Sequence, residues 1–409
     1  MKSTQRVRLN SREMGRAALV LIVCLLFVDR LTTSALAQSA TSCGLTSWQI
    51  REPLVTVWLR DAVYDPSVGF VAVGDYGVIL VSPDGENWTA RYQPQSVGFT
   101  RVCRSNGSYV VMGQQFGAGS NTWSAVLWTS DDALTWTTRY TATNTVVTGL
   151  AAGNGILVAV AVMTSPGEPV TAQSLVSTDG QQWNPAGTIS QRWISDITFG
   201  NGVFVAIGGS RIFASDDAAA WIEATVPTGS SLRAVGFHLG QFVAVGEAGM
   251  ILTSPDGLEW TSRSSGSTAS LSAVAGGAGY VAVAGNSGTV LTSQDGVSWV
   301  PRLGSLLDLR GLAYGADTFV AFGRYGAIYQ SGTIAGCGAP RLSITRGPMT
   351  RVDLTGAIGA RHRIEYTDRL GAGWIFLTEV ASLPQSPYAV IDPTPSPTGQ
   401  RFYRAIQLP

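Results

Sequence analysis

The stretch Thr253-Ser254-Pro255-Asp256-Gly257-Leu258-Glu259-Trp260 occurs six times, with small changes, along this chain of 409 residues. The copies share the template S-x-D-[G/A]-x-x-W. An apolar run enters each copy and a strand-like run that begins at the tryptophan leaves it, which predicts a hairpin with the motif at its corner. The aspartates and tryptophans of the six copies are Asp84 and Trp88, Asp132 and Trp136, Asp179 and Trp183, Asp217 and Trp221, Asp256 and Trp260, and Asp295 and Trp299.

The residue types of the motif suit a turn. An aspartate at a corner can accept hydrogen bonds from backbone N–H groups of its own turn, and glycine tolerates a positive φ. Ala133 and Ala218 replace the glycine in two copies, so either the turn does not require a positive φ or these copies carry strain. The tryptophan can cover the turn with a large apolar face. We interpret both residues as structural rather than as parts of a cation or glycan site.

The spacing of the motifs predicts the architecture. Successive aspartates are 48, 47, 38, 39 and 39 residues apart, and a period near 40 is typical of propellers. An inner segment that begins at Leu59, Ile194, Leu232, Leu271 and Leu309 repeats in step with them. Four strands per repeat make one propeller blade. We therefore expect an all-β, seven-bladed β-propeller.

The two ends of the repeat region complement each other. The last repeat stops near Gly332 without the motif, whereas residues 47–51 match the fourth strand of the other repeats. This predicts that the N-terminal strand closes the ring as the outer strand of blade seven. Cys43 and Cys337 flank these two segments, and in an exported protein such a pair predicts a disulfide.

The six motifs resemble the Asp-box (BNR) repeats of sialidase-like and photosystem-assembly-factor-like β-propellers, over about residues 47–332. The usual box, S-x-D-x-G-x-T-W, has one more residue between aspartate and tryptophan. The resemblance implies a propeller and invites two functions, a glycan-active hydrolase of sialidase-like fold or an assembly factor for a membrane complex. The arginine phrase found near the start of sialidases is absent; Arg51-Glu52-Pro53 is the nearest approach, and it falls in a predicted outer strand.

The chain ends predict export and a second domain. Residues 1–37 have a basic head, an apolar run over 17–28 and an Ala35-Leu36-Ala37 cleavage site, which is typical of a secretory signal peptide. The run is too short to span a bilayer, so we expect a secreted or periplasmic protein without stable membrane insertion. Residues 38–46 form a lead, 47–337 the propeller and 338–409 a small β-sandwich that resembles immunoglobulin- or fibronectin-like modules. That module is a spacer, an attachment module or a glycan binder.

The composition excludes several chemistries. After cleavage 21 arginines face 25 acidic residues and no lysine remains, which excludes Schiff-base chemistry and a P-loop and gives no reason to expect nucleic-acid binding. The two histidines, His238 and His362, lack neighbours at ligand spacing, so we expect no metal site and no Ser-His-Asp triad. We expect no cofactor and a monomer.

The candidate ligand site lies on the face opposite the motif corners. Arg60, Arg233 and Arg310 begin their inner strands at equivalent positions, and Arg101, Asp61 and Asp196 stand one place further on. Because blades seven, one and two are consecutive in a closed ring, Arg310, Arg60 and Arg101 form a predicted basic arc suited to a carboxylate or an acidic peptide. Alternatively, these arginines pair with the aspartates and line a wet channel.

Two enlarged loops lie on the same predicted face, at residues 114–124 and 163–173. The first contains Phe116 and Trp123, which act either as a platform for a sugar or as packing within the loop. Taken together, the residues predict a secreted, non-enzymatic binding or scaffold protein that uses this face for a protein or glycan ligand. The hydrolase and the assembly factor are the alternatives.

Overall fold

The computed structural model describes residues 44–92, 97–116, 122–227, 229 and 231–334, and six strands between residues 341 and 408. The predicted signal peptide, Cys43 and Cys337 lie outside the described residues, so export and the disulfide stay predictions. The described residues contain strands and five 3-10 turns of three residues each, and no α-helix. None of their helical segments has the length and apolar character needed to cross a bilayer.

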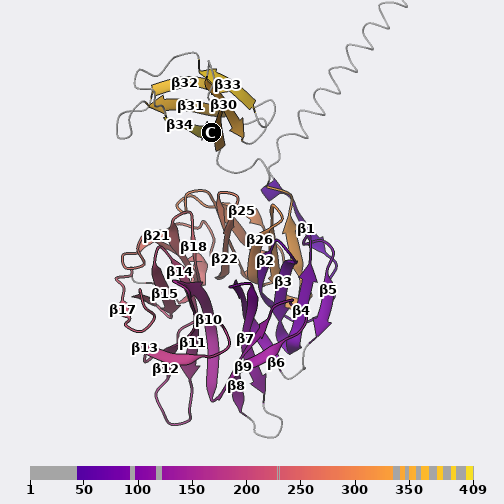
Figure 1. The fold of residues 1–409 in the computed structure, drawn as a ribbon, viewed down its shortest axis with the longest axis vertical. Helices are drawn as coiled ribbons and strands as arrows, with labels where there is room; N and C mark the ends of the chain where they lie inside the picture. Colours follow the sequence, from indigo (N-terminus) through magenta and orange to yellow (C-terminus); the bar gives the residue numbers. More distant parts are fainter. Residues whose placement is uncertain are drawn as a thin grey trace, which may run out of the picture. The chain divides into compact units, whose positions relative to one another are not determined.

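The described residues between 44 and 334 form seven four-stranded antiparallel sheets arranged about a common axis (Figure 1). Blade one contains β2 (Leu59–Asp65), β3 (Gly69–Gly74), β4 (Val78–Ser82) and β5 (Thr89–Tyr92); blade two contains β6 (Val97–Ser105), β7 (Ser108–Phe116), β8 (Trp123–Ser130) and β9 (Thr137–Thr143). Blade three contains β10 (Thr145–Gly153), β11 (Ile156–Met163), β12 (Thr171–Ser177) and β13 (Asn184–Ser190); blade four contains β14 (Asp196–Gly200), β15 (Val203–Gly208), β16 (Arg211–Ser215) and β17 (Ile222–Glu223).

Blade five contains β18 (Leu232–His238), β19 (Gln241–Gly246), β20 (Ile251–Ser254) and β21 (Thr261–Arg263); blade six contains β22 (Leu271–Gly277), β23 (Tyr280–Gly285), β24 (Val290–Ser293) and β25 (Val300–Leu303). Blade seven contains β26 (Leu309–Gly315), β27 (Thr318–Gly323), β28 (Ile328–Ser331) and β1 (Trp48–Arg51). Each inner strand packs beside the next around the ring, and β26 packs beside β2. The predicted all-β propeller with seven blades is therefore confirmed.

Neighbouring blades are held together by a repeated contact between a glycine and an aromatic ring. A Cβ added to Gly153 or Gly200 would lie about 2 Å from the ring of the next blade's Phe199 or Phe237. Gly277 faces Tyr314 in the same way, and Gly315 of blade seven faces Tyr64 of blade one, where the distance would be 2.0 Å. Only glycine permits so close an approach. The junction between the last and first blades thus has the same packing as junctions within the chain.

The motif corners have the hydrogen bonds expected of them. Asp84 Oδ1 accepts the N–H groups of Glu86 and Asn87 at 2.8 Å, and the Trp88 indole N–H donates to the Gly85 carbonyl at 2.8 Å. Ala133 and Ala218 have φ values of 56° and 61°, so the turn does require a positive φ and these two copies carry strain. Both methyl groups are fully buried, which offsets part of that cost.

The seventh corner is built from two distant segments. β1 pairs with β28 in an antiparallel register that places Trp48 opposite Ser331. The Trp48 indole N–H donates to the Leu45 carbonyl of the turn η1 (Gly44–Thr46) at 3.1 Å, as Trp88 does to Gly85. The Gly332 N–H donates to the carbonyl groups of Gly44 and Ser47.

The C-terminal residues form a separate compact unit, which begins at residue 340. One three-stranded sheet contains β29 (Arg341–Thr345), β30 (Thr350–Thr355) and β33 (Tyr388–Asp392). The other contains β32 (Ile375–Val380), β31 (Arg361–Thr367) and β34 (Phe402–Leu408). The sandwich arrangement stays a prediction.

Outer-strand arginines pair with a polar residue of the neighbouring third strand, which within one repeat lies ten positions earlier. Arg139, Arg263 and Arg302 each donate from Nε to a threonine Oγ1 at 2.8 Å. In blade seven Arg51 Nε donates to Gln330 Oε1 at 2.9 Å. Blade one has Val81 at this position, and Arg91 Nε is buried without a hydrogen-bond partner.

We predict that Val81→Thr stabilises the propeller by about 1 kcal/mol, because it supplies the acceptor that Arg91 lacks. Urea unfolding measures the change. Val176→Thr is the matched control: Val176 occupies the same position in blade three, whose outer strand has no arginine there. An equal gain in both variants would show that threonine acts through strand propensity instead.

We also predict that Trp48→Ala destabilises the propeller by roughly 2 kcal/mol, because the half-buried indole packs against the core of blade seven. Ile50→Ala, on the same strand, removes a side chain that is 63 % exposed and should change stability by less than about 0.5 kcal/mol. Unfolding midpoints that do not differ between the two variants would mean that the ring does not depend on this strand.

Candidate functional site

The loops between second and third strands, together with the starts of the inner strands, form one face of the propeller, which we call the loop face. Four of these loops are 3-10 turns: η2 (Asp75–Gly77), η3 (Glu247–Gly249), η4 (Asn286–Gly288) and η5 (Arg324–Gly326). The central residue of each has a positive φ of 53° to 59°. Those central residues are Tyr76, Ala248, Ser287 and Tyr325.

A bulge near the start of the inner strand recurs at the same position in six of the seven blades. In six blades the pairing of the first two strands skips one residue, such as Arg60 between Leu59 and Asp61. Bulges of this kind re-aim side chains at the rims of rings. The skipped residues are Arg60, Thr100, Thr148, Arg233, Ser272 and Arg310, with Ser195 in the equivalent position of blade four. All seven carry a hydroxyl or a guanidinium group, and none carries a carboxylate.

Three guanidinium groups surround one indole ring. Arg60, Arg310 and Arg324 lie 5.2, 5.4 and 5.9 Å from the ring centroid of Trp58, respectively. They come from β2, β26 and η5, so the cluster exists only because blades seven and one are neighbours. Arg324 also lies 4.6 Å from the ring of Tyr325. We call Trp58 and these three arginines the Trp58 cluster.

Ion pairs neutralise part of this basic surface. Arg60 makes two bonds to Asp75, at 2.9 and 3.0 Å, and Arg233 pairs with Glu247 at 2.9 Å. Arg310 donates to the Ser272 hydroxyl at 2.6 Å. Within the described part of the chain, Arg310 and Arg324 have no ion pair.

Like charges act on Arg310. Burial lowers the pKa of Arg310, and the positive charge of Arg233 lowers it further. Arg60 acts in the same direction, whereas Asp308 opposes it. An anion at this place would offset both the desolvation and the repulsion.

Arg101 lies in the next layer of the channel and not in the cluster. It pairs at 3.3 Å with Asp196 of blade four, which is two blades away from its own blade two. Asp61 Oδ2 accepts the Val102 N–H at 3.0 Å, and Asp196 Oδ2 accepts the Val235 N–H at 3.1 Å. Burial raises the pKa of Asp61 to about 6 against the attraction of Arg101. For Arg101 the structure therefore matches the alternative in which arginine and aspartates line the channel.

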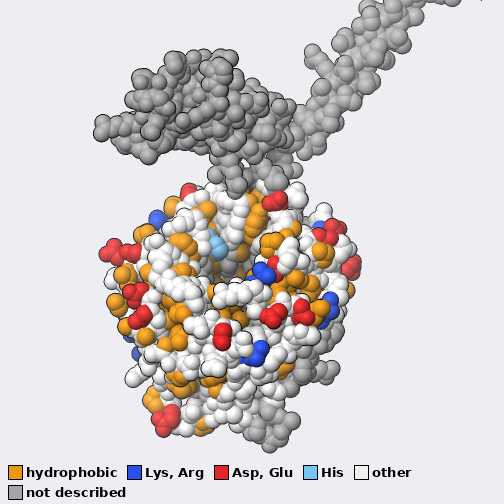
Figure 2. Space-filling view, in the orientation of Figure 1, with side chains coloured by type: hydrophobic (Ala, Val, Ile, Leu, Met, Phe, Trp, Pro, Cys, Tyr) orange, Lys and Arg blue, Asp and Glu red, His pale blue; other side chains and the backbone are white. Residues whose placement is uncertain are grey.

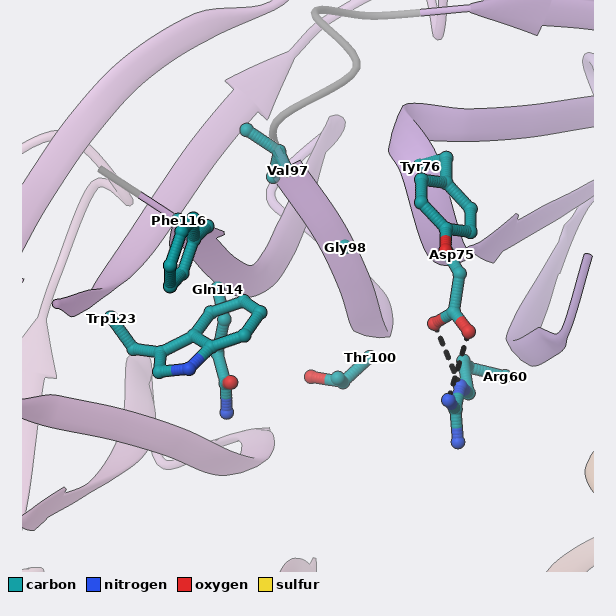
Figure 3. A pocket seen from close by; sticks show the side chains of 9 residues that line it. All are labelled: Arg60, Asp75, Tyr76, Val97, Gly98, Thr100, Gln114, Phe116 and Trp123. Carbon is teal, nitrogen blue, oxygen red and sulfur yellow. Dashed lines mark hydrogen bonds and ion pairs between the residues drawn. The ribbon is translucent and has the colours of Figure 1, made fainter. Parts of the chain in front are cut away.

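A cleft lies beside Arg60, between blades one and two (Figure 3). Its volume is about 490 Å³, and its lining comes from Arg60, from η2, from β6, and from the end of β7 and the start of β8. Phe116 and Trp123 form one wall, with ring centroids 4.9 Å apart at 62°, and are 41 % and 51 % exposed. They pack against each other and also line the cleft; a role of Trp123 as a sugar platform stays a prediction.

The remaining reactive side chains lie elsewhere. Burial lowers the pKa of His238 to about 4, and burial raises the pKa of Cys103 to about 12. Both therefore stay neutral near pH 7. Across the residues that the structure describes, no group of three or more His, Cys, Asp or Glu side chains is placed to share a metal ion. The face drawn in Figure 2 has a hollow at the centre of the ring, and its acidic and basic side chains are intermixed.

The structure brings Arg60 and Arg310 together, places Arg233 near enough to repel Arg310, and places Phe116 and Trp123 on the cleft. Sequence reasoning missed Trp58, Asp75 and Tyr76, and the arginine and tyrosine of η5. One signal was available: Asp75-Tyr76-Gly77 and Arg324-Tyr325-Gly326 carry tyrosine where two other blades carry alanine or serine. A bulky residue at positive φ is unusual and marks functional positions.

Comparison with solved structures shows the fold. The chain is similar to YCF48 bound to a D1 peptide, with 17 % identity and a TM-score of 0.55 over 70 % of this chain and 95 % of that one. YCF48 from Cyanidioschyzon merolae is 18 % identical, with a TM-score of 0.53 over 70 % of this chain and 98 % of that chain. A catalytically inactive virginiamycin B lyase from Staphylococcus aureus with quinupristin is 13 % identical, with a TM-score of 0.55 over 70 % of this chain and 100 % of that chain. No family profile and no curated protein sequence matches the chain.

The raised pKa of Asp61 predicts a pH dependence. A carboxyl whose pKa rises from 3.8 to about 6 on folding contributes stability below about pH 4, and this contribution is lost as the pH rises through 6. The Asp61→Asn variant has no carboxyl group to titrate at this position, so it lacks this pH-dependent contribution to stability, and its amide oxygen can still accept the Val102 N–H. We therefore expect the stability of the variant relative to the wild type to rise between pH 4 and 6, in urea unfolding.

Asp84→Asn is the control with the opposite sign. Burial opposes ionisation of Asp84, but hydrogen bonds from Asn87 and Glu86 outweigh it and lower the pKa to about 2. Its contribution is present above about pH 4 and lost as the pH falls through 2. Between pH 5 and 7 the Asp84→Asn difference should be constant. A flat Asp61→Asn difference from pH 4 to 6 would contradict the raised pKa.

Proposed function

We propose that the chain is an exported, non-enzymatic binding or scaffold protein whose loop face binds an acidic segment of a partner protein. The observation that carries this proposal is the Trp58 cluster, three guanidinium groups gathered on one indole ring at 5.2 to 5.9 Å. Like charges repel, so a folded protein has no general reason to gather them at a half-exposed mouth. A carboxylate ligand supplies that reason.

The chemistry of the cluster suits carboxylates. Guanidinium groups bind carboxylates through paired hydrogen bonds, and they stack on aromatic faces while doing so. Arg310 and Arg324 have no ion pair among the described residues, so their charges are available. Among the other side chains at the bulges, Thr148 Oγ1 and Arg233 Nε are buried without a hydrogen-bond partner.

The structural likeness is compatible with a protein ligand. One similar propeller, YCF48, was solved bound to a D1 peptide. The assembly-factor alternative is compatible with this proposal, because such a factor would bind its client through the same face. We also propose that the six corners are Asp-box repeats, that the N-terminal strand closes the ring, and that the C-terminal sheets form a sandwich used as a spacer or attachment module.

The rival function is a glycan-active hydrolase, which needs two carboxyl groups facing each other across a substrate site. The seven side chains of the mouth layer include no carboxylate. Asp61 and Asp196 lie one layer deeper, where each accepts a backbone N–H and both are attracted to Arg101. This geometry favours binding, and hydrolysis of sialyl or uronate oligosaccharides by the purified protein would favour the rival.

We predict that a fluorescein-labelled glutamate-rich peptide binds the purified protein and that Arg310→Ala weakens binding by roughly tenfold. Fluorescence anisotropy measures the affinity. Binding should also weaken as salt rises from about 0.05 to 0.5 M, because exposed charges are screened.

Arg211→Ala is the matched control. Arg211 is an exposed arginine of blade four that pairs with Glu223 outside the cluster, so its loss should leave peptide affinity unchanged. Equal losses in the two variants would indicate a general charge effect, and no binding of the acidic peptide to the wild type would refute the proposed function.

A further inference from the structure

The cleft beside Arg60 has a glycine, Gly98, in its lining. Trp58 in blade one stands two positions before Arg60, and Trp193 in blade four stands two positions before the equivalent Ser195; in blade two the residue two positions before Thr100 is Gly98. A Cβ at Gly98 would meet only Asp75 Oδ1, at 3.9 Å. The floor of the cleft is therefore open where two other blades place an indole (Figure 3).

The walls of the cleft are aromatic and exposed. Phe116 and Trp123 are register partners at the far end of the β7–β8 hairpin. Tyr76 faces them from η2, and it is 65 % exposed with a φ of 58°. An exposed tyrosine gains little from folding, and the left-handed conformation is unfavourable for a bulky residue. Contact with a ligand accounts for a tyrosine here.

The cleft is continuous with the Trp58 cluster. Arg60 lines the cleft, stacks on Trp58 and makes two bonds to Asp75, which lines the cleft as well. A ligand side chain in the cleft would lie next to Arg60 and hence next to the guanidinium groups of Arg310 and Arg324. The positive charge of the Trp58 cluster therefore favours a ligand that has carboxylates next to the side chain bound in the cleft.

We propose that the cleft binds an aromatic side chain of the same acidic segment, so that the loop face recognises a two-part motif of carboxylate and aromatic residue. This inference rests on the proposed function. An aromatic ring fits because the space over Gly98 is open and is lined by three aromatic side chains, Tyr76, Phe116 and Trp123, and aromatic rings prefer offset or edge-to-face contacts with one another. A neutral sugar fits less well, because both oxygens of Asp75 are already bonded to Arg60.

The test uses two labelled peptides, both rich in glutamate: one carries a single phenylalanine, and the other has alanine in its place. The wild-type protein should bind the phenylalanine peptide roughly tenfold more tightly. Gly98→Val fills the floor of the cleft, and blade three already carries Val146 at the equivalent position. Trp123→Ala removes a wall. Each variant should reduce the preference to less than about twofold and leave the affinity for the alanine peptide unchanged.

Trp193→Ala is the matched control, since Trp193 is an exposed tryptophan, 45 % against 51 % for Trp123, and does not line the cleft. It should retain the full preference. Circular dichroism melts establish that each variant is folded, and Trp123→Ala keeps the test decisive if Gly98→Val does not fold.

A phenylalanine preference that survives in both cleft variants would overturn the inference. Displacement of the peptides by polygalacturonate that depends on Trp123, without a phenylalanine preference, would also overturn it and assign the cleft to an acidic glycan. The proposed function is separable: binding of the alanine peptide that depends on Arg310 upholds it even if the cleft plays no part, and absence of that binding refutes it.

Discussion

The structure depends on the contact between a glycine of one blade and an aromatic ring of the next. Gly153, Gly200 and Gly277 each lie against the ring of the following blade, and Gly315 lies against Tyr64 across the two ends of the ring. No side chain fits between these partners, so the angle between blades is set by direct backbone-to-ring packing. The seventh junction uses the same contact as three of the internal junctions, and it brings residues from the two ends of the repeat region into one site.

The candidate site follows from that closure. Six of the seven inner strands have a bulge near their start, and the arginines at the bulges of blades one and seven meet over Trp58. Asp61 and Asp196 each accept a backbone N–H group from the inner strand of the next blade. Asp196 also pairs with Arg101. A rigid, charged layer therefore lies beneath a layer of donors, and the exposed tyrosines of η2 and η5 stand beside it.

Much of the fold could be predicted from the sequence, because the repeated S-x-D corner and its spacing report local structure that each copy forms by itself. The equivalent positions of Arg60, Arg233 and Arg310 could be found in the same way. The Trp58 cluster could not, since cation–π contacts join three elements whose proximity depends on ring closure and side-chain direction. The position of Arg101 depended on a single skipped residue at Thr100, which moves it from the mouth to the layer below. The cleft could not be predicted either, because Gly98 in its lining has no side chain that would mark a site in the sequence.

A crystal structure of residues 38–409, at a resolution that defines guanidinium planes, tests the central claim most directly. We expect seven blades, with Gly315 against the ring of Tyr64 and the guanidinium groups of Arg60, Arg310 and Arg324 around Trp58. Six or eight blades, or a Trp58 ring packed into the core with these arginines paired to separate carboxylates, would contradict the account of both the ring and its site.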